Sequence, residues 1–243
     1  MIYYEEDDNS DLALRASRNI LSGNKGAENN MIICRGLDVH DTITTIDEWK
    51  EKCPPERDDY HWQDDRSAME LAKEWLNNNG QALKNLLNNH PDFQGINLIK
   101  ASPEYETRFD KYGRGRKHDL IIIGEKENEK IVISVEAKVD EGFGNDTVES
   151  YYMKAILKRL SGVATNVPDR VEGLIRALFS QPYSKNIIDL QYQLLHAVAG
   201  TLAEAKKQDA AKAFFLVHTF KTSKMDAGKN KDNNKKLDRF VRV

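Results

Sequence analysis

The sequence of 243 residues is 40% hydrophobic and 31% charged, and its 36 basic and 39 acidic residues give a net charge of −3. This composition is typical of a globular protein with a charged surface, long enough to bury a core without disulfide or metal support. The net charge gives no overall attraction to nucleic acid, so any basic surface that contacts nucleic acid must be local.

Cysteine usage and apolar runs indicate the setting in which the chain works. Cys34 and Cys53 are the only cysteines, which argues against a disulfide scaffold or a thiolate zinc site and favours two buried thiols in a reducing compartment. No stretch approaches the roughly 20 apolar residues that span a bilayer, and the acidic N-terminus is unlike a secretory signal. We therefore expect a cytoplasmic protein that does not bind a membrane.

The first half of the chain predicts mainly helices. Residues 67–78 give the strongest helical pattern, with Ser67 and Glu70 spaced as in a capping box and an apolar stripe following them. The further elements expected here are helices over 12–21, 45–52 and 81–88, a short strand at 31–34, and a strand within 95–110 with a turn at Ser102-Pro103.

Residues 119–139 carry the clearest local pattern. The segments DLIIIG (119–124) and KIVISVEAKV (130–139) are short apolar runs rich in β-branched residues, as buried strands are. The segment between them is polar, so together they predict a β-hairpin.

The second half of the chain predicts helices and one late strand. Asp146 and Glu149 are spaced as in a capping box that begins a helix ending near Leu160. The remaining expected elements are helices over 169–179 and 190–207, a strand over 213–220, and a solvated tail from Lys221 with a last helical turn at 237–241.

This order of elements predicts an α/β fold in which helices flank a central mixed β-sheet. We expect residues 1–60 to form an N-terminal extension that packs on the core, residues 61–221 to form the core, and residues 222–243 to form a Lys- and Asn-rich C-terminal tail.

Three charged residues lie within the apolar strands of the predicted hairpin. If the turn centres between Glu127 and Asn128, the antiparallel register places Asp119 opposite Glu136, with their β-carbons about 4.5–5.5 Å apart. Strand alternation then brings Lys138 to the same face of the sheet. Two carboxylates and an ammonium group would therefore converge at one end of the sheet.

This combination suits the hydrolysis of a phosphodiester. Clustered carboxylates repel one another unless positive charge lies between them, and the hard cation Mg²⁺ takes oxygen ligands of this kind. A bound metal polarises a phosphodiester and lowers the pKa of a coordinated water, while Lys138 could orient that water or neutralise developing charge. The alternative is a surface hairpin whose Asp, Glu and Lys form an ordinary ion pair.

The motif His118-Asp119, sixteen intervening residues, then Glu136-Ala137-Lys138 resembles that of the PD-(D/E)xK nuclease superfamily, which includes restriction endonucleases. The resemblance implies a restriction-endonuclease-like core over about residues 65–220. It also implies that Asp119 and Glu136 are metal ligands and that Lys138 is the catalytic lysine. His118 stands where the superfamily often has proline.

The resemblance implies two further site residues. Many members carry an additional acidic ligand on the helix before the sheet, where this chain has Glu70, although a capping glutamate is the alternative. Related nucleases often place a glutamine from a following helix beside the metal. Gln193 is preferred over Gln191 for this role, and a glutamine at the solvent edge of a helix is the alternative.

A basic segment leads directly into Asp119. Its glycines favour a flexible loop, and its cationic side chains could contact phosphates, although charge runs are often solvated turns. The residues expected to contact substrate are Lys111, Arg114, Arg116, Lys117 and His118.

Together these features predict a metal-dependent endonuclease that uses Mg²⁺, with Mn²⁺ as a substitute, and that cuts DNA rather than RNA. The resemblance implies restriction or phage defence, a homodimer, and a partner protein in a defence system. The alternative is a non-catalytic nucleic-acid- or protein-binding module that retains the nuclease fold.

Overall fold

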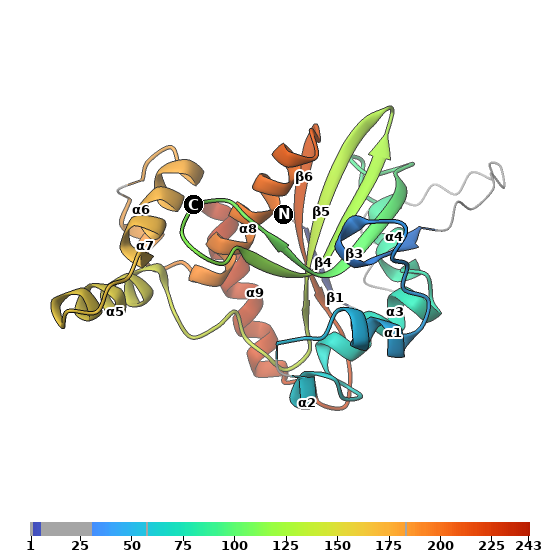
Figure 1. The fold of residues 1–243 in the computed structure, drawn as a ribbon, viewed down its shortest axis with the longest axis horizontal. Coiled ribbons are helices and arrows are strands. Elements are labelled where there is room, and N and C mark those ends of the chain that lie inside the picture. The colour runs from blue at the N-terminus through green and yellow to red at the C-terminus, as the bar shows by residue number, and fades with distance from the viewer. Residues whose placement is uncertain (1, 6–30, 57, 183) are drawn as a thin grey trace.

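A six-stranded mixed sheet forms the centre of the computed structural model, which describes residues 2–5, 31–56, 58–182 and 184–243 (Figure 1). The strand order is β1-β6-β5-β4-β3-β2. Strands β3, β4 and β5 are antiparallel neighbours, whereas β2 pairs with β3, and β6 with both β5 and β1, in parallel. The strands are β1 (Ile2–Glu5), β2 (Ile32–Ile33), β3 (Asn97–Thr107), β4 (Arg116–Lys126), β5 (Glu129–Lys138) and β6 (Lys212–Thr219).

The β4–β5 hairpin has the predicted turn and register. Glu127 and Asn128 both have positive φ, 53° and 66°, as the two central residues of a type I′ turn do. The pairing of Lys126 with Glu129 continues to Leu120 opposite Val135, so Asp119 and Glu136 are the next residues along the two strands. The apolar runs are buried on both faces of the sheet, as their sequence predicted.

One face of the sheet is covered by the N-terminal helices, which lie on the right in Figure 1. Trp49, Leu71, Trp75 and Leu83 from these helices pack with Ile133 and other residues of the central strands. The helices on this side are α1 (Ile46–Lys52), α2 (Asp58–His61), α3 (Ser67–Asn77) and α4 (Gln81–Asn88). The short 3₁₀ turn Arg35–Leu37 lies beside β3, and its Leu37 packs with Ile121 and with Ala205 of α8 on the other side of the sheet.

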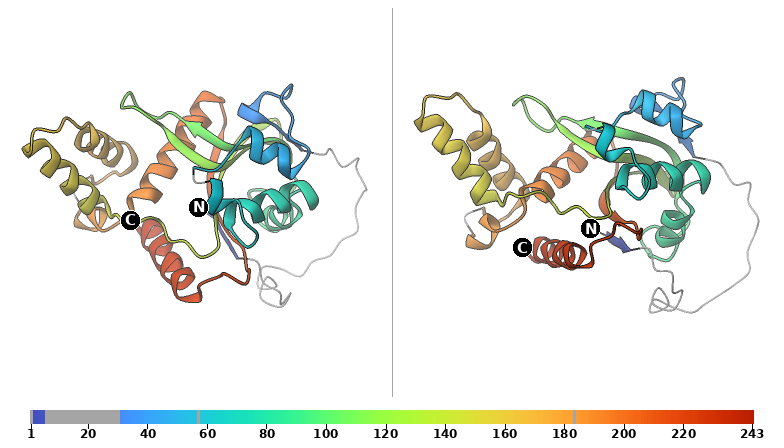
Figure 2. Two further views of the ribbon diagram at one scale, coloured as in Figure 1. Left: turned by 60° about the horizontal axis from the view of Figure 1, so that its bottom comes forward. Right: turned by 90° about the horizontal axis from the view of Figure 1, so that it is seen from below.

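The other face carries the C-terminal helices, and α5, α6 and α7 extend away from the sheet (Figure 2). The axis of this layer is α8, which lies close against β3 and β4 because Gly200 has no side chain: a β-carbon there would come within 2.6 Å of His118 Nε2. The helices of this layer are α5 (Val148–Leu160), α6 (Val167–Leu178), α7 (Lys185–Ile188), α8 (Tyr192–Lys207) and α9 (Ala227–Arg242).

The α/β class and the mixed sheet flanked by helices are therefore confirmed, but the C-terminal tail was predicted wrongly. Residues 227–242 form one helix, α9, instead of a solvated segment with one helical turn. Leu237 and Phe240 are 4% and 9% exposed and join the core on the α8 side of the sheet. Both cysteines are buried free thiols, as expected.

Smaller differences concern caps and turns. The Thr147 hydroxyl, not Asp146, caps α5 by accepting from the backbone N–H of Ser150. Ser102 and Pro103 lie inside β3 and not in a turn. The helix predicted over 12–21 lies outside the described residues.

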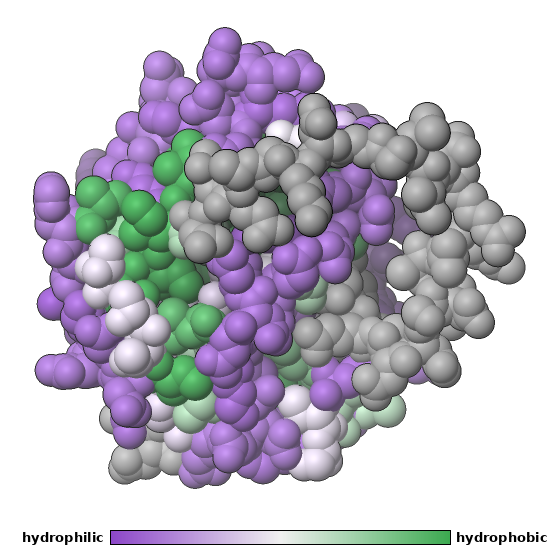
Figure 3. Space-filling view, turned by 90° about the vertical axis from the view of Figure 1, so that its right-hand side faces the viewer, coloured by the Kyte–Doolittle hydropathy of each residue, from purple (hydrophilic) through white to green (hydrophobic). Residues whose placement is uncertain are grey.

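The face seen in Figure 3 is mostly hydrophilic, with a group of hydrophobic residues toward its left side. Within the part of the chain that the structure describes, no helix combines the length and apolar character needed to cross a membrane.

Candidate active site

The sheet opens at the level of Asp119. The β4–β5 ladder stops at Leu120 opposite Val135, while β5 continues to pair with β6 as far as Lys138. The Asp119 carboxylate partly fills the gap, since its Oδ2 accepts the backbone N–H of Ala137 at 2.7 Å. The separation of the two strands leaves room for side chains between them, and the charged residues of the motif lie at this point.

Glu136 is the most densely bonded of these residues and is 3% exposed. Its Oε1 accepts from Lys138 Nζ at 2.9 Å and from Gln193 Nε2 at 2.6 Å, and its Oε2 is ion-paired with Arg116. Gln193 reaches this carboxylate from the first turn of α8. The predicted grouping of Glu136, Lys138 and Gln193 is thus present, with Arg116 as an additional member.

The two carboxyl groups of the motif have opposite electrostatic environments. Burial, reinforced by the negative charges of Glu136 and Glu104, raises the pKa of Asp119 well above its usual range. Burial acts in the same direction on Glu136, but the positive charges of Arg116 and Lys138 outweigh it and lower the pKa of Glu136 to about 2. Asp119 is therefore the acid whose negative charge the site compensates least.

A third acid, Glu104, was not predicted. It lies on β3 with a positive φ of 49°, and the β3–β4 ladder omits both Glu104 and Asp119 between its regular pairs. Its carboxylate pairs with Lys117 Nζ at 2.8 Å, and burial raises its pKa. The preceding Pro103 lacks an N–H donor, and a proline within a strand is the sequence signal for such an irregularity.

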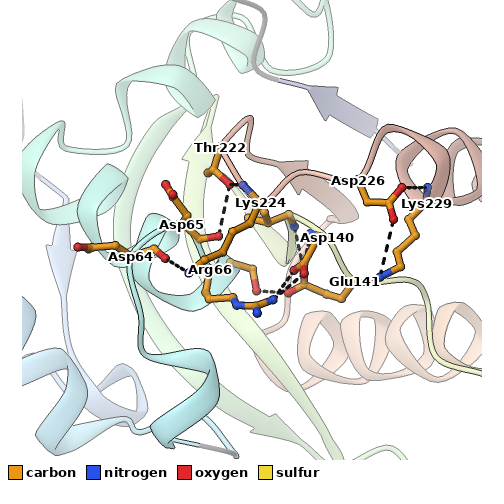
Figure 4. Close-up of polar contacts among 11 residues, drawn as sticks. Asp64, Asp65, Arg66, Asp140, Glu141, Thr222, Lys224, Asp226 and Lys229 are labelled. Carbon is orange, nitrogen blue, oxygen red and sulfur yellow. Dashed lines mark hydrogen bonds and ion pairs between the residues drawn. The ribbon is translucent and has the colours of Figure 1, made fainter.

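A second polar network holds the segment that follows β5 (Figure 4). Arg66, just before α3, pairs with Asp140 at 2.6 Å, and Ser67 donates to Glu141 Oε1. The other oxygen of Glu141 accepts the backbone N–H groups of Val139 and Asp140, each at 2.9 Å. These bonds fix the turn that follows Lys138.

The same network includes the segment that precedes α9. Lys224 Nζ donates to the backbone carbonyl of Asp64 at 2.6 Å, and Thr222 donates to that of Asp65 at 3.3 Å (Figure 4). The segment before α3 and the segment before α9, about 160 residues apart in the chain, therefore meet near the end of β5.

A polar cleft of about 260 Å³ opens onto these groups. It lies between the start of α3, the irregular part of β3 and β4, the end of β5 and the start of α8. Its charged and polar lining residues are Glu56, His61, Ser67, Glu104, Arg116, Lys117, Asp119, Glu136, Lys138, Glu141 and Gln193.

The structure does not bring every predicted site residue to this cleft. Glu70 points elsewhere: its carboxylate pairs with Lys73 at 2.8 Å and accepts the backbone N–H of Asp65 at 3.1 Å. The Ser67–Glu70 capping box is absent, because the N-cap residue is Arg66 and Ser67 bonds to Glu141. Glu104 lines the cleft with Asp119 and Glu136, whereas Glu70 does not.

His118 is fully buried and does not line the cleft. Its Nε2 lies 3.1 Å from the Thr107 hydroxyl, and burial lowers its pKa to about 3, so the imidazole is neutral. The predicted contact between His118 and substrate is therefore not supported. Arg116 and Lys117, in contrast, do line the cleft.

Lys111 and Arg114 are exposed on the loop that precedes β4, outside the cleft lining. This loop is anchored rather than flexible. Arg170 from α6 pairs with Asp110 at 2.7 Å and donates to the carbonyl of Arg114 at 2.8 Å. The two exposed cations are thereby presented from a fixed backbone.

The donor chemistry of the cleft fits a hard divalent cation. Asp119, Glu136 and Glu104 offer carboxylate oxygens, which Mg²⁺ prefers, and no cysteine lines the cleft. In the arrangement present, Arg116, Lys117 and Lys138 take the places beside these oxygens. Accordingly, no group of three or more His, Cys, Asp or Glu side chains stands in a ligating arrangement within the described ranges.

Comparison with known proteins adds one family. No curated protein and no solved structure matches the chain. A family model does match, and it spans residues 42–243, which include all the strands from β3 to β6 and every lining residue of the cleft. The chain therefore belongs to the family described as Domain of unknown function (DUF6946).

Proposed function

We propose that this protein is a metal-dependent nuclease with a restriction-endonuclease-like core, which hydrolyses phosphodiester bonds in DNA. The observation that carries the proposal is the meeting of Asp119, Glu136 and Lys138 at the opening between β4 and β5, with Gln193 bonded to Glu136. A buried cluster of this kind costs folding energy, and strongly perturbed pKa values in a cleft favour a functional site over a structural ion pair.

Asp119 and Glu136 would hold Mg²⁺ or Mn²⁺, with Glu104 as the third carboxylate in place of Glu70. The bound cation would polarise the scissile phosphodiester and lower the pKa of a coordinated water. Lys138 would orient that water or neutralise the charge that develops on the phosphate. Its burial opposes the charged form, but the adjacent Glu136 raises the pKa of Lys138, so the ammonium stays protonated.

The surrounding cations would contact the nucleic acid. Arg116 and Lys117 line the cleft, and Lys111 and Arg114 extend from the loop that Arg170 anchors. Their local positive charge answers the objection raised by the net charge of −3, because phosphate contacts need only a basic patch. DNA as the substrate, a role in restriction or phage defence, a homodimer and a partner protein rest on the resemblance to the PD-(D/E)xK superfamily.

The decisive experiment compares wild type with Lys138→Met, which keeps the length of the side chain and removes its charge. Both are incubated with plasmid and single-stranded DNA in Mg²⁺, Mn²⁺ or EDTA. We expect metal-dependent cutting by wild type and a loss of at least about 100-fold in the variant. Lys154→Met on α5, whose lysine is 62% exposed and outside the cleft, should cut as wild type does.

Lys138→Met that folds and cuts within a few-fold of wild type would refute the proposal. One observation favours the alternative of a non-catalytic binding module: Arg116 and Lys138 both pair with Glu136 and neutralise its carboxylate without a metal. Calorimetry separates the two interpretations, because a lapsed site should release no heat on titration with Mn²⁺ whether DNA is present or not.

A further inference from the structure

The Arg116 guanidinium lies beside the carboxylates to which the proposed function assigns a divalent metal ion. Its guanidinium pairs with Glu136 Oε2 while Lys138 and Gln193 occupy Oε1, so both oxygens of this carboxylate are engaged. Asp119 and Glu104 also contribute favourable electrostatic interactions to the same guanidinium. Arg116 therefore neutralises negative charge that, in the proposed function, a metal ion would neutralise.

The guanidinium is not fully bonded in this position. Its Nε is buried and has no hydrogen-bond acceptor among the described residues. A planar guanidinium presents its donors as a fork that matches two oxygens of a phosphate. Arg116 thus has donor capacity that Glu136 does not use and a phosphodiester could.

Arg116 also has room to change partners. It lines the polar cleft, and it lines a neighbouring hollow of about 320 Å³ formed with Gly144, Tyr192, Gln193 and His196. The side chain is 14% exposed. It therefore stands at the border between the catalytic cleft and an open space on the α8 side.

The charges of the cluster constrain how a dication could enter. Glu136 is paired with Arg116 and Lys138, and Glu104 is paired with Lys117, so three cations already lie beside these carboxylates. A dication that enters while all three cations stay in place adds positive charge to a largely buried site, which is unfavourable. The balance improves if an anion enters at the same time and one resident cation turns toward it.

We infer that Arg116 is an exchange residue that couples nucleic-acid binding to metal binding. Without substrate it holds Glu136; when a phosphodiester enters, its guanidinium transfers to the phosphate and leaves Glu136 Oε2 open to the divalent cation. The inference rests on the proposed function and adds the order of events at that site. It makes the affinity for metal depend on the presence of nucleic acid, through one side chain.

The test measures Mn²⁺ affinity by isothermal titration calorimetry, with and without a DNA duplex whose phosphorothioate linkages resist cleavage. Arg116→Gln removes the charge but keeps a donor toward Glu136. Without DNA it should bind Mn²⁺ at least about tenfold more tightly than wild type, within the usual range of coupling between sites. Arg116→Lys, which keeps a cation, should stay close to wild type, and so should the control Arg176→Gln on α6.

DNA should then tighten Mn²⁺ binding more in wild type than in Arg116→Gln. Equal Mn²⁺ affinities for these two proteins, with equal effects of DNA, would overturn the exchange, and cutting by wild type would still support the proposed function. Absence of both Mn²⁺ binding and cutting would overturn both proposals.

A measurement on wild type alone covers the case in which Arg116→Gln does not fold. Dimethyl phosphate, the smallest phosphodiester, offers Arg116 an anion without the other contacts of DNA. It should tighten the binding of Mn²⁺ to wild type, and an unchanged Mn²⁺ affinity at saturating diester would overturn the exchange.

Discussion

Replacing Asp119 by asparagine removes the carboxylate that the site compensates least, and we expect the variant to be more stable than wild type in EDTA. Burial and the charges of Glu136 and Glu104 raise the pKa of Asp119. Asparagine has nearly the same shape, and its amide oxygen can still accept the backbone N–H of Ala137. The substitution therefore removes the cost of a buried charge without creating a cavity.

The sign of the pH dependence follows from the direction of this shift. The folded protein holds the Asp119 proton more tightly than the unfolded chain, whose aspartate pKa is about 3.9. Wild type thus loses stability as the pH rises from there to the raised folded value, and it keeps that loss at higher pH. The asparagine side chain of the variant does not titrate, so the advantage of the variant should be small near pH 4 and largest in alkaline buffer.

The size of the effect is that of burying a charge whose compensation is incomplete, about 1–3 kcal/mol. For a chain of this length this corresponds to about 2–12 °C in the unfolding midpoint. Thermal or urea unfolding of both proteins in EDTA across about pH 4.5 to 8.5 measures the difference. Asp238→Asn, at an exposed position on α9, controls for the loss of one negative charge and should stay within about 0.5 kcal/mol.

Metal should cancel or reverse the difference in stability between the two proteins if the proposed function is correct. Mg²⁺ at a hundredfold its dissociation constant would stabilise wild type by about 2.7 kcal/mol, whereas Asp119→Asn should gain little. A variant that is no more stable than wild type in EDTA at high pH, or whose advantage does not change with pH, would show that Asp119 carries no buried-charge cost.

Three further experiments test the contacts that support the site and the core. Arg170→Gln should free the loop anchored through Asp110, cost about 1–3 kcal/mol, and make the loop a site of rapid cleavage in limited trypsin digestion; an undigested loop would contradict the anchoring. Leu237→Ala should cost about 2–5 kcal/mol in urea unfolding because α9 is part of the core. A cost near zero would instead support a solvated C-terminal tail. A double-mutant cycle of Arg66→Ala and Asp140→Ala should give a coupling energy of about 0.5–3 kcal/mol, and additive effects would remove this pair from the support of β5.

The hairpin was predictable because everything that determines it is local. Two β-branched apolar runs define the strands, and the polar residues between them include Glu127 and Asn128, which take the positive φ values of the turn. The turn position fixes the register, and the register places Asp119 opposite Glu136. Only the resemblance predicted that Gln193 lies near Glu136, because nothing local to residue 193 indicates this contact with a residue 57 positions away.

The α9 helix was missed because half of its buried face is polar. Its buried residues, Asn230, Asn233, Leu237 and Phe240, follow helical spacing, but an apolar stripe cannot be recognised from two members. Asn233 is buried because it donates to the carbonyl of Glu141 at 2.9 Å. Such a tertiary hydrogen bond leaves no trace in the local sequence.

The prediction of Glu70 in the cleft, where the structure has Glu104, failed for the same reason: the outcome depends on contacts between distant segments. The sequence fits a capping box at Ser67 and Glu70, but Ser67 instead bonds to Glu141, 74 residues later. Glu104 enters the cleft because β3 is irregular after Pro103, and the interpretation of Pro103 as part of a turn concealed this. Local patterns thus identified the hairpin and its charged residues, while the neighbours supplied by distant segments required the tertiary structure.

The mixed topology of the sheet determines when the site can form while the chain is being synthesised. The β4–β5 hairpin closes through a two-residue turn and needs only nearby residues, whereas β6 must join β5 in parallel after the long segment that contains α5 to α8. Pairings between distant segments form late, because loop closure must precede their contacts. A nascent chain therefore presents Asp119, Glu136 and Lys138 before Gln193 and the β6 support exist, and we expect no competent site on the ribosome until the C-terminal third has emerged.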